Sequence, residues 1–559
     1  MTRNTVSSDR FQARFGTSPL SILLLKNLLT GQAVARKATQ AFVVRTPLRV
    51  SDPTFLTEVE SVSSEGAEIA FVVADVSRRY RAAVRVSPHG EGLRWSVRVS
   101  GPEPIWMVEW RLTGLDLEEV ILPALGGQAL KKQMPAGTVL SYKYPFWWNA
   151  QFVIGAMRHG GVWLHTMEIE PKFKLIRVRK SGDRFDLTYG FEADGPLSST
   201  TLEGTWYLDA YKGSWNIPVT HHRAWMEEAF GAVELPRNPF SPPWAADINF
   251  VLEIWGIGKE FPGPLHTFDE TVRRLKAWSR LHDPVKTLVY LPGFAEHGID
   301  SRAPFYRPSP ELGGGDGFRR MVDVAHSMGY RVMAHTNVLA MTFDHPLFER
   351  FKQHQIVDVF ARPQGWAMDI DGDWLGEPYF AYINPGAKEW GDLMQEIIGE
   401  LISKFALDAI FLDQTLLAFN TCQGPNVQKG MREHIQRLQR AFPTTLFAGE
   451  GLHEQVLAAL PMAQIHGIDS IAEIHGMEGK VRWRTAHPVS TELFGPYTKF
   501  TAHLLTRHPT HHMFALQEEA YAQLGVLPAL CLYNKEQAMD LPATRAMIRR
   551  ANRLSRNRS

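Results

Sequence analysis

Two carboxylates stand at the ends of successive apolar stretches, where they could act on a bound molecule. Residues 407–415 read LDAIFLDQT, so that a buried run ends in Asp413, and residues 445–451 read TLFAGEG, so that the following run ends in Glu450. A pair of carboxyl groups can serve as nucleophile and as general acid and base. The chemistry that this pattern favours is the cleavage of a glycosidic bond.

Each carboxylate also has a purely structural interpretation. Asp413 could cap the helix that follows its strand, because Asp is a preferred N-cap residue. Glu450 could be a solvated loop residue, although Gly449 and Gly451 remove side-chain bulk and would allow a ligand to approach closely. A retaining glycosidase holds its two carboxyl groups about 5 to 5.5 Å apart and an inverting one about 6.5 to 9.5 Å apart. The sequence leaves that choice open.

Further polar and aromatic residues are placed where they could contact a sugar. His335 and Asn337 end an apolar strand, and Asp247 and Trp255 flank another. A structural histidine and a core tryptophan are the alternatives for His335 and Trp255. The complete set of residues that we predict to bind substrate is His335, Asn337, Asp247, Trp255, Gln414, Trp374 and Glu473.

Known metal and nucleotide motifs are missing from the sequence. Residues 369–373 have the Asp-x-Asp-Gly-Asp spacing of a calcium loop, but the closing Glu of an EF-hand is lacking, and the flanking tryptophans suit a loop that covers substrate. The chain has no His-Glu-x-x-His motif, no phosphate-binding Gly-rich loop with Lys, and only two cysteines. We therefore predict no metal and no cofactor.

Composition restricts the partners of this 559-residue chain. Lys and Arg number 60 and Asp and Glu 59, so no overall positive field would hold a nucleic acid. No apolar stretch is long enough for a membrane span, and residues 1–14 lack the pattern of a secretory leader. We expect a cytoplasmic protein whose partner is an oligosaccharide or glycoside, with no nucleic acid and no membrane partner; a homo-oligomer stays open.

Two kinds of element would position the candidate residues. Between residues 11 and 208, short apolar strands alternate with Gly, Pro, Asn and Asp turns, which is typical of an antiparallel β-sandwich. Four prolines at 236–243 mark a junction, and beyond them strands alternate with amphipathic helices, as in a (β/α)8 TIM-type barrel. We predict a sandwich over 1–235, a barrel over 236–540 and a helical tail over 541–559.

The later barrel strands are harder to assign. Residues 465–468, 471–474 and 503–514 compete for the sixth and seventh strands, and 527–533 is the candidate for the last.

The order strand, Asp413, helix, strand, Glu450 resembles that of the retaining α-glycosidase barrels. It is most similar to the endo-α-N-acetylgalactosaminidase-like hydrolases of families 101 and 129 and their relatives, which also share a segment like Tyr382-Ile383-Asn384-Pro385-Gly386. Residues 22–31, ILLLKNLLTG, resemble the start of the galactose-mutarotase-like sandwich that precedes such barrels. The resemblance implies that Asp413 is the nucleophile and Glu450 the acid/base of a retaining enzyme.

Two other functions fit the same sequence. A carbohydrate lyase or epimerase would use a Tyr, His or Lys base and could leave an unsaturated product. A sugar-binding protein without catalysis would need only the fold and the polar residues, because a fold alone does not establish chemistry.

Overall fold

The structure, a computed structural model, describes residues 4–18, 20–258, 263–366, 380–451, 453–465, 485–502, 514–535 and 537–556. It divides into two compact units. The first comprises Met1–Phe230 and Val359–Ala361, and the second comprises Gly231–Asp358 and Arg362–Ser559. The predicted sites Trp374 and Glu473 and the segment 369–373 lie outside the described residues.

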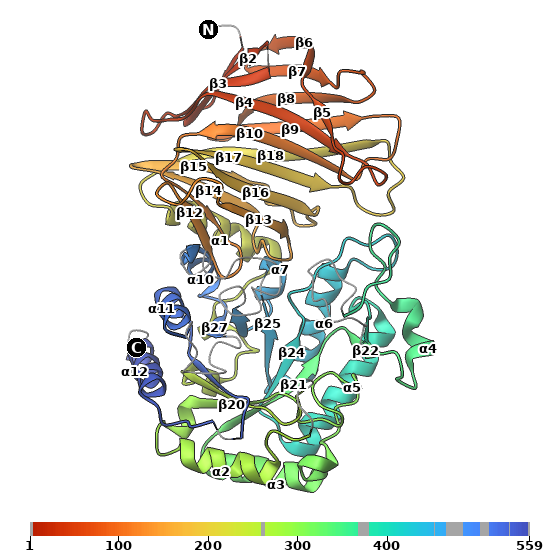
Figure 1. Ribbon diagram of the computed structural model, residues 1–559, viewed down its shortest axis with the longest axis vertical. Helices are drawn as coiled ribbons and strands as arrows, with labels where there is room; N and C mark the ends of the chain where they lie inside the picture. Colours follow the sequence, from red (N-terminus) through yellow and green to blue (C-terminus); the bar gives the residue numbers. More distant parts are fainter. Residues whose placement is uncertain are drawn as a thin grey trace. The chain divides into compact units, whose positions relative to one another are not determined.

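The first unit is a sandwich of two antiparallel nine-stranded sheets, as predicted (Figure 1). One sheet has the order β1-β2-β3-β4-β10-β17-β16-β13, with β5 paired to β4, and the other has the order β12-β11-β14-β15-β18-β9-β8-β7-β6. The strands are β1 Thr5–Ser7, β2 Phe11–Thr17, β3 Leu20–Asn27, β4 Ala33–Arg45, β5 Thr54–Leu56, β6 Glu58–Glu65, β7 Glu68–Ala74, β8 Arg81–His89, β9 Gly92–Ser100, β10 Met107–Leu115, β11 Glu119–Leu122, β12 Gln128–Lys131, β13 Val139–Tyr144, β14 Phe152–Met157, β15 Gly160–His165, β16 Lys174–Ser181, β17 Arg184–Glu192 and β18 Thr201–Lys212. Helix α1, Asn216–Phe230, ends the unit.

Alternating side chains give each sheet one apolar face. Along β9, Trp95 and Val97 are buried while Arg94 and Arg98 are exposed, which is the period of a half-buried strand. Trp95 and Trp110, from opposite sheets, lie 5.9 Å apart by ring centroids and tie the two layers together.

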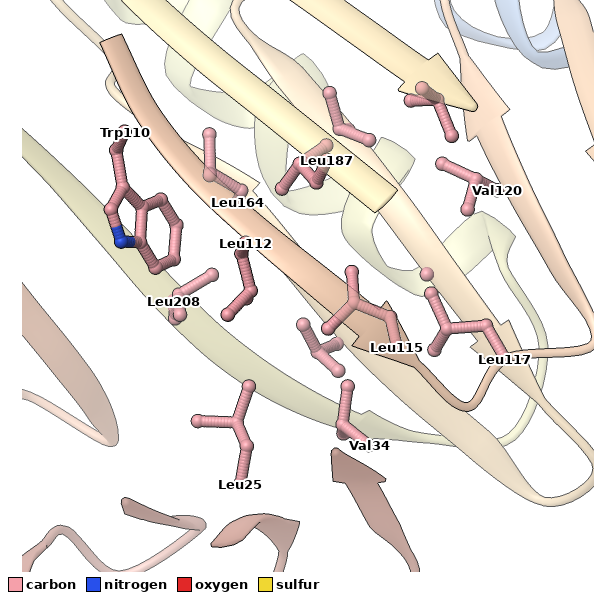
Figure 2. Close-up of a pocket in the computed structure, with 14 residues that line it drawn as sticks. Leu25, Val34, Trp110, Leu112, Leu115, Leu117, Val120, Leu164, Leu187 and Leu208 are labelled. Atoms are coloured by element: carbon pink, nitrogen blue, oxygen red, sulfur yellow. The ribbon is translucent and has the colours of Figure 1, made fainter. Parts of the chain in front are cut away.

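The two sheets do not fill the space between them completely. A cavity of about 40 Å³ lies there, and Leu and Val residues, one Gly and one Trp line it (Figure 2). Its lining has no charged group, so the cavity belongs to the apolar core.

The second unit contains the predicted barrel. Its eight parallel strands run in the order β27-β26-β25-β24-β21-β20-β19-β28, and a parallel bridge between Thr501 and Leu527 links the two ends of this order. The strands are β19 Phe250–Ile254, β20 Thr287–Leu291, β21 Arg331–Asn337, β24 Ala409–Asp413, β25 Leu446–Glu450, β26 Met462–Ile465, β27 Lys499–Ala502 and β28 Ala529–Leu532. The sandwich followed by a (β/α)8-type barrel is therefore confirmed.

Helices connect the strands and cover the outside of the sheet (Figure 1). They are α2 Phe268–Trp278, α3 Gly314–Ser327, α5 Lys388–Phe405, α6 Val427–Ala441, α7 Glu454–Leu457, α10 Val489–Phe494, α11 Phe514–Leu524 and, after the last strand, α12 Pro542–Arg556. Helix α2 illustrates why the sequence forms a helix at this place. Thr267 and Glu270 form a capping box at its start, and the helix buries Phe268, Leu275 and Trp278 on one face.

The second unit also contains short strands and helices. A two-stranded sheet joins β22, Ala340–Thr342, to β23, Phe380–Tyr382, and α4 is Phe348–Phe351. The 3-10 helices are η1 Leu235–Arg237, η2 Pro243–Ala246, η3 Pro284–Lys286, η4 Pro310–Leu312 and η5 Lys352–His354. Within the described ranges, no helix is long and apolar enough to cross a membrane.

The structure fills in the two strands that the sequence left open: the sixth is Met462–Ile465 and the seventh is Lys499–Ala502. Of the three competing candidates, 465–468 shares only residue 465 with a strand, and 471–474 and nearly all of 503–514 lie outside the described residues. The last strand, Ala529–Leu532, lies within the predicted 527–533.

Candidate active site

Three neighbouring strands deliver the candidate residues to one end of the barrel. Asp413 is the last residue of β24, Glu450 the last of β25, and Asn337 the last of β21. Asn337 pairs with Asp413 across the ladder, and Leu412 pairs with Gly449 one residue before the two carboxylates. The carboxyl ends of parallel strands share one face of a barrel, which is where active sites of this fold lie.

The structural interpretations of the two carboxylates do not hold. Helix α6 starts at Val427 and takes its cap from Asn426, so Asp413 caps no helix. Glu450 is only 9% exposed, which is too buried for a solvated loop residue.

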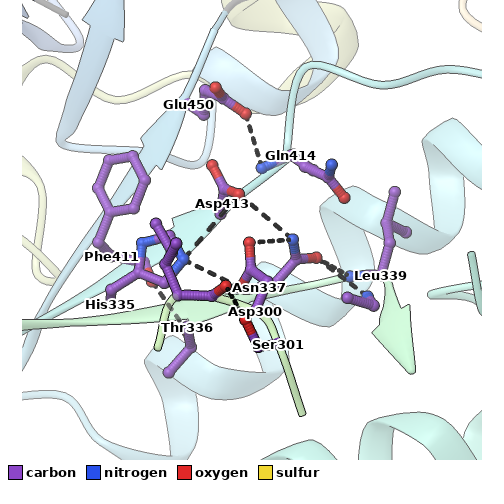
Figure 3. Close-up of polar contacts among 12 residues, drawn as sticks. Asp300, Ser301, His335, Thr336, Asn337, Leu339, Phe411, Asp413, Gln414 and Glu450 are labelled. Carbon is purple, nitrogen blue, oxygen red and sulfur yellow. Dashed lines mark hydrogen bonds and ion pairs between the residues drawn. The ribbon is translucent and has the colours of Figure 1, made fainter. Parts of the chain in front are cut away.

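Asn337 links two carboxylates. Its Nδ2 donates to Asp413 Oδ2 and to Asp300 Oδ2, each over 3.3 Å (Figure 3). Its Oδ1 accepts from the backbone N–H groups of Leu339 and Ala340, each over 3.0 Å, and this fixes which end of the amide faces the carboxylates. Asn337 is fully buried, and its hydrogen bond holds the Asp413 carboxylate in place.

His335 completes the network. Its Nε2 lies 3.1 Å from Asp300 Oδ1 and 4.0 Å from Asp413 Oδ2, and its Nδ1 lies 2.7 Å from the hydroxyl of Tyr290. Burial first, and then the negative charges around it, beginning with Asp413, raise the pKa of Tyr290 well above its usual value. Tyr290 therefore keeps its proton and can donate to Nδ1, which leaves the Nε2 proton of His335 for Asp300.

A second tyrosine supports the loop that carries Asp300. The hydroxyl of Tyr306 accepts from the backbone N–H of Asn337 over 2.7 Å, and burial, followed by the charge of Asp300, raises its pKa well above the usual range. Neither tyrosine is poised to ionise, so neither is suited to be the base of a lyase or epimerase.

Glu450 is held by the turn that follows Asp413. The backbone N–H of Gln414 donates to Glu450 Oε2 over 2.9 Å, and Thr415 Oγ1 donates to the backbone carbonyl of Glu450 over 2.5 Å. Gln414 adopts a left-handed conformation with φ 62°, so the chain turns sharply directly after β24. Gly451 has φ 58°, and a Cβ there would collide with Leu416, so this glycine serves the packing of the turn.

Gln414 brings an amide group to the same region. Its Nε2 lies 3.5 Å from the hydroxyl of Tyr382, and its buried Oε1 has no hydrogen-bond partner among the described residues.

Asp300, His335 and Asp413 offer one ligand atom each within 4.8 Å of one another, a spacing that could hold a metal ion. However, the Asn337 amide donates hydrogen bonds to both carboxylates, and its orientation is fixed. The geometry therefore fits a hydrogen-bond network better than a coordination sphere.

Two predicted residues are not brought into this network. Asp247 is exposed and precedes β19, which puts it at the amino end of the barrel strands, opposite to Asp413. The strand that Asp247 and Trp255 were expected to flank is Phe250–Ile254. Trp255 is at the carboxyl end but packs in an apolar cluster with Leu265, Cys531 and Tyr533, so it is a core residue rather than a platform for a sugar ring.

Sequence analysis missed three residues of this network, which are Asp300, Tyr290 and Tyr306. Asp300 lies in the long segment after β20, without a strand end to mark it, and Tyr290 is hidden in the apolar run of β20 itself. The backbone turns sharply around Asp300, because His297, Gly298 and Asp300 all have positive φ, and Gly298 is the only sign of this turn in the sequence.

Solved structures with the same fold include an α-N-acetylgalactosaminidase and an α-galactosidase domain. The ligand-free alpha-N-acetylgalactosaminidase NagBb from Bifidobacterium bifidum matches 98% of this chain and 93% of its own with 14% identity and a TM-score of 0.74, and its GalNAc complex matches 99% and 92% with 13% identity and a TM-score of 0.72. The galactosidase domain of the alpha-galactosidase-sucrose kinase AgaSK matches 99% and 85% with 12% identity and a TM-score of 0.50. No model of a known family and no curated protein sequence matches the chain. At these identities the similarity establishes the fold.

Proposed function

We propose that this protein is a glycoside hydrolase that cleaves an α-linked sugar by a retaining double displacement. Asp413 attacks the anomeric carbon and forms a glycosyl-enzyme ester while Glu450 gives its proton to the leaving oxygen. Glu450 then takes a proton from water, whose oxygen attacks the anomeric carbon and releases Asp413. The net stereochemistry is retention, because two inversions follow one another.

The observation that carries this proposal is the pair of carboxylates on adjacent strand ends, joined through one turn. Asp413 ends β24, and the N–H of the next residue, Gln414, bonds to Glu450 at the end of β25 over 2.9 Å. Asn337 orients the Asp413 carboxylate, as a nucleophile requires.

The same network supports the binding of sugar hydroxyls. Asp300, His335 and Asn337 are buried polar groups around Asp413, and the Gln414 amide offers a further polar contact. The solved relatives of this fold are described as acting on α-galactosides or α-N-acetylgalactosaminides, so we propose these two sugar classes as the first substrates to test. A non-catalytic sugar-binding protein would not require the two carboxylates to be linked.

The test is the release of nitrophenol from a panel of α- and β-linked aryl glycosides. We expect the wild type to hydrolyse an α-glycoside and Asp413→Asn and Glu450→Gln to lose this activity. Glu433→Gln, an exposed carboxylate on α6, is the matched control and should be fully active. Turnover by Asp413→Asn at the wild-type rate would refute the assignment.

A further inference from the structure

Two buried N–H groups without acceptors lie in the segments that follow β20 and β22. Arg302 Nε and His345 Nε2 are buried, and within the described part of the chain neither has a hydrogen-bond partner. An arginine Nε is always a donor, and His345 Nδ1 accepts from the backbone N–H of Leu347 over 3.1 Å, so the proton of a neutral His345 is on Nε2. Leaving such donors unpaired is costly, which indicates that something else supplies the acceptor.

The loop after β20 and the segment after β22 bring these residues together. The backbone N–H of Thr342, the last residue of β22, donates to the carbonyl of Ala303 over 3.0 Å. The rings of Phe305 and His345 lie 4.2 Å apart by centroids. Burial lowers the pKa of His345; exposed Asp344 opposes that shift, and the positive charge of Arg302 adds to it, so Arg302 is near enough to act on the ring.

The charge of Arg302 is not neutralised locally. Its Nη1 lies 3.2 Å from His297 Nε2, and among the described residues no carboxylate forms an ion pair with it. Asp300, two residues earlier, directs its carboxylate to His335 and Asn337. Arg302 and His345 therefore present a positive charge and two N–H donors, and within the described residues no anion pairs with them.

We propose that Arg302 and His345 form an oxyanion subsite that receives a sulfate ester or a carboxylate of the saccharide held at Asp413. A site made only of donors, one of them on a guanidinium, matches an oxyanion and not a sugar hydroxyl, which also needs to donate. Two residues of chain span at most about 7 Å, so the backbone of Arg302 stays close to that of Asp300. This inference rests on the proposed function and narrows its substrates to acidic glycosides.

Binding to Asp413→Asn, in which hydrolysis is blocked, tests the subsite. Galactose, galactose 6-sulfate and galacturonate are titrated by calorimetry, so that the two acidic sugars distinguish the sulfate from the carboxylate. We expect at least one acidic sugar to bind about tenfold more tightly than galactose. When Arg302→Gln is combined with Asp413→Asn, the preference for the acidic sugar should disappear while the affinity for galactose stays the same. Arg302→Lys, which keeps the charge but not the Nε donor, should retain only part of that preference.

Arg307→Gln is the matched control. Arg307 is in the same loop, is exposed, and stacks over Phe305 at 5.5 Å from the ring centroid. Equal affinity for all three sugars, or an equal loss of preference in Arg302→Gln and Arg307→Gln, would overturn the subsite. A preference that depends on Arg302 in a protein that hydrolyses no glycoside would instead overturn the hydrolase and leave the subsite standing.

Discussion

Asn337 and Asp413 are paired twice, once through the backbone ladder of β21 and β24 and once through the bond from Asn337 Nδ2 to Asp413 Oδ2. The side-chain bond is directional because two backbone N–H groups hold the other end of the amide. The position of the proposed nucleophile therefore depends on a residue that makes no covalent contribution to the reaction.

Replacing Asn337 with Ala should lower kcat by about tenfold to a hundredfold, because a hydrogen bond to a charged group is lost next to the reacting atom. Steady-state kinetics on the best aryl glycoside measures this effect. Asn384→Ala is the control, since Asn384 makes a similar turn, accepting from Gly386 N–H and donating to the Pro425 carbonyl, without touching a carboxylate. Unchanged kcat in Asn337→Ala would show that Asp413 needs no such support.

Asp408 has a different role from Asp413, although the two lie at opposite ends of the same strand. It precedes β24 and accepts from His326 Nε2 over 2.7 Å, Arg331 Nη1 over 2.8 Å and the backbone N–H of Val332 over 2.9 Å. Burial opposes its ionisation, but these bonds outweigh burial and lower its pKa. Residues at the amino ends of barrel strands serve stability rather than catalysis.

We expect Asp408→Asn to lower the free energy of unfolding by about 2 kcal/mol, since His326 and Arg331 are partly exposed and water replaces part of what they lose. The folded variant should keep the wild-type kcat. Thermal unfolding measures the change in stability, and the nitrophenol assay measures kcat. A large fall in kcat with no change in Tm would contradict a structural role for Asp408.

Two buried histidines should make the protein sensitive to acid. Burial lowers the pKa of both His434 and His453 to about 4, and neither ring has a hydrogen-bond partner among the described residues. In the unfolded chain the pKa of histidine is about 6.5. Between these values the unfolded state binds more protons, so stability falls as the pH drops from about 6.5 to about 4, by up to about 3 kcal/mol for each histidine.

Urea unfolding at pH 7 and at pH 4.5 measures this loss. His434→Gln cannot be protonated and should show a smaller difference between the two pH values than the wild type. His326→Gln is a useful control, because its bond to Asp408 raises the pKa of His326, so that its contribution is present at low pH and lost as the pH rises. An identical pH dependence in the wild type and in His434→Gln would contradict the assignment.

The proposed catalytic pair was accessible from the sequence because its signal is local. Asp413 and Glu450 each end a continuous apolar run. Such a run is typical of a buried parallel strand, and the carboxyl end of such a strand lies at the face of the barrel where active sites are found. His335 and Asn337 could be predicted for the same reason, since they end β21.

Asp300 and Tyr306 could not be found this way because tertiary contacts place them. Their loop is anchored to β22 through Ala303 and to Asn337 through the Tyr306 hydroxyl, and neither contact leaves a periodic pattern. Asp247 shows a different error: it precedes β19, which starts at Phe250, so it lies at the amino end of the barrel strands and not at the end that carries Asp413.

The measurement that tests the central claim most directly is azide rescue of Asp413→Gly on an activated aryl α-glycoside. Removing the carboxylate leaves space for azide to attack the anomeric carbon from the side that Asp413 occupied, so the activity should return and the product should be the β-glycosyl azide. Formation of the α-glycosyl azide would give Asp413 the acid/base role instead, and full hydrolysis without azide would show that Asp413 is not the nucleophile.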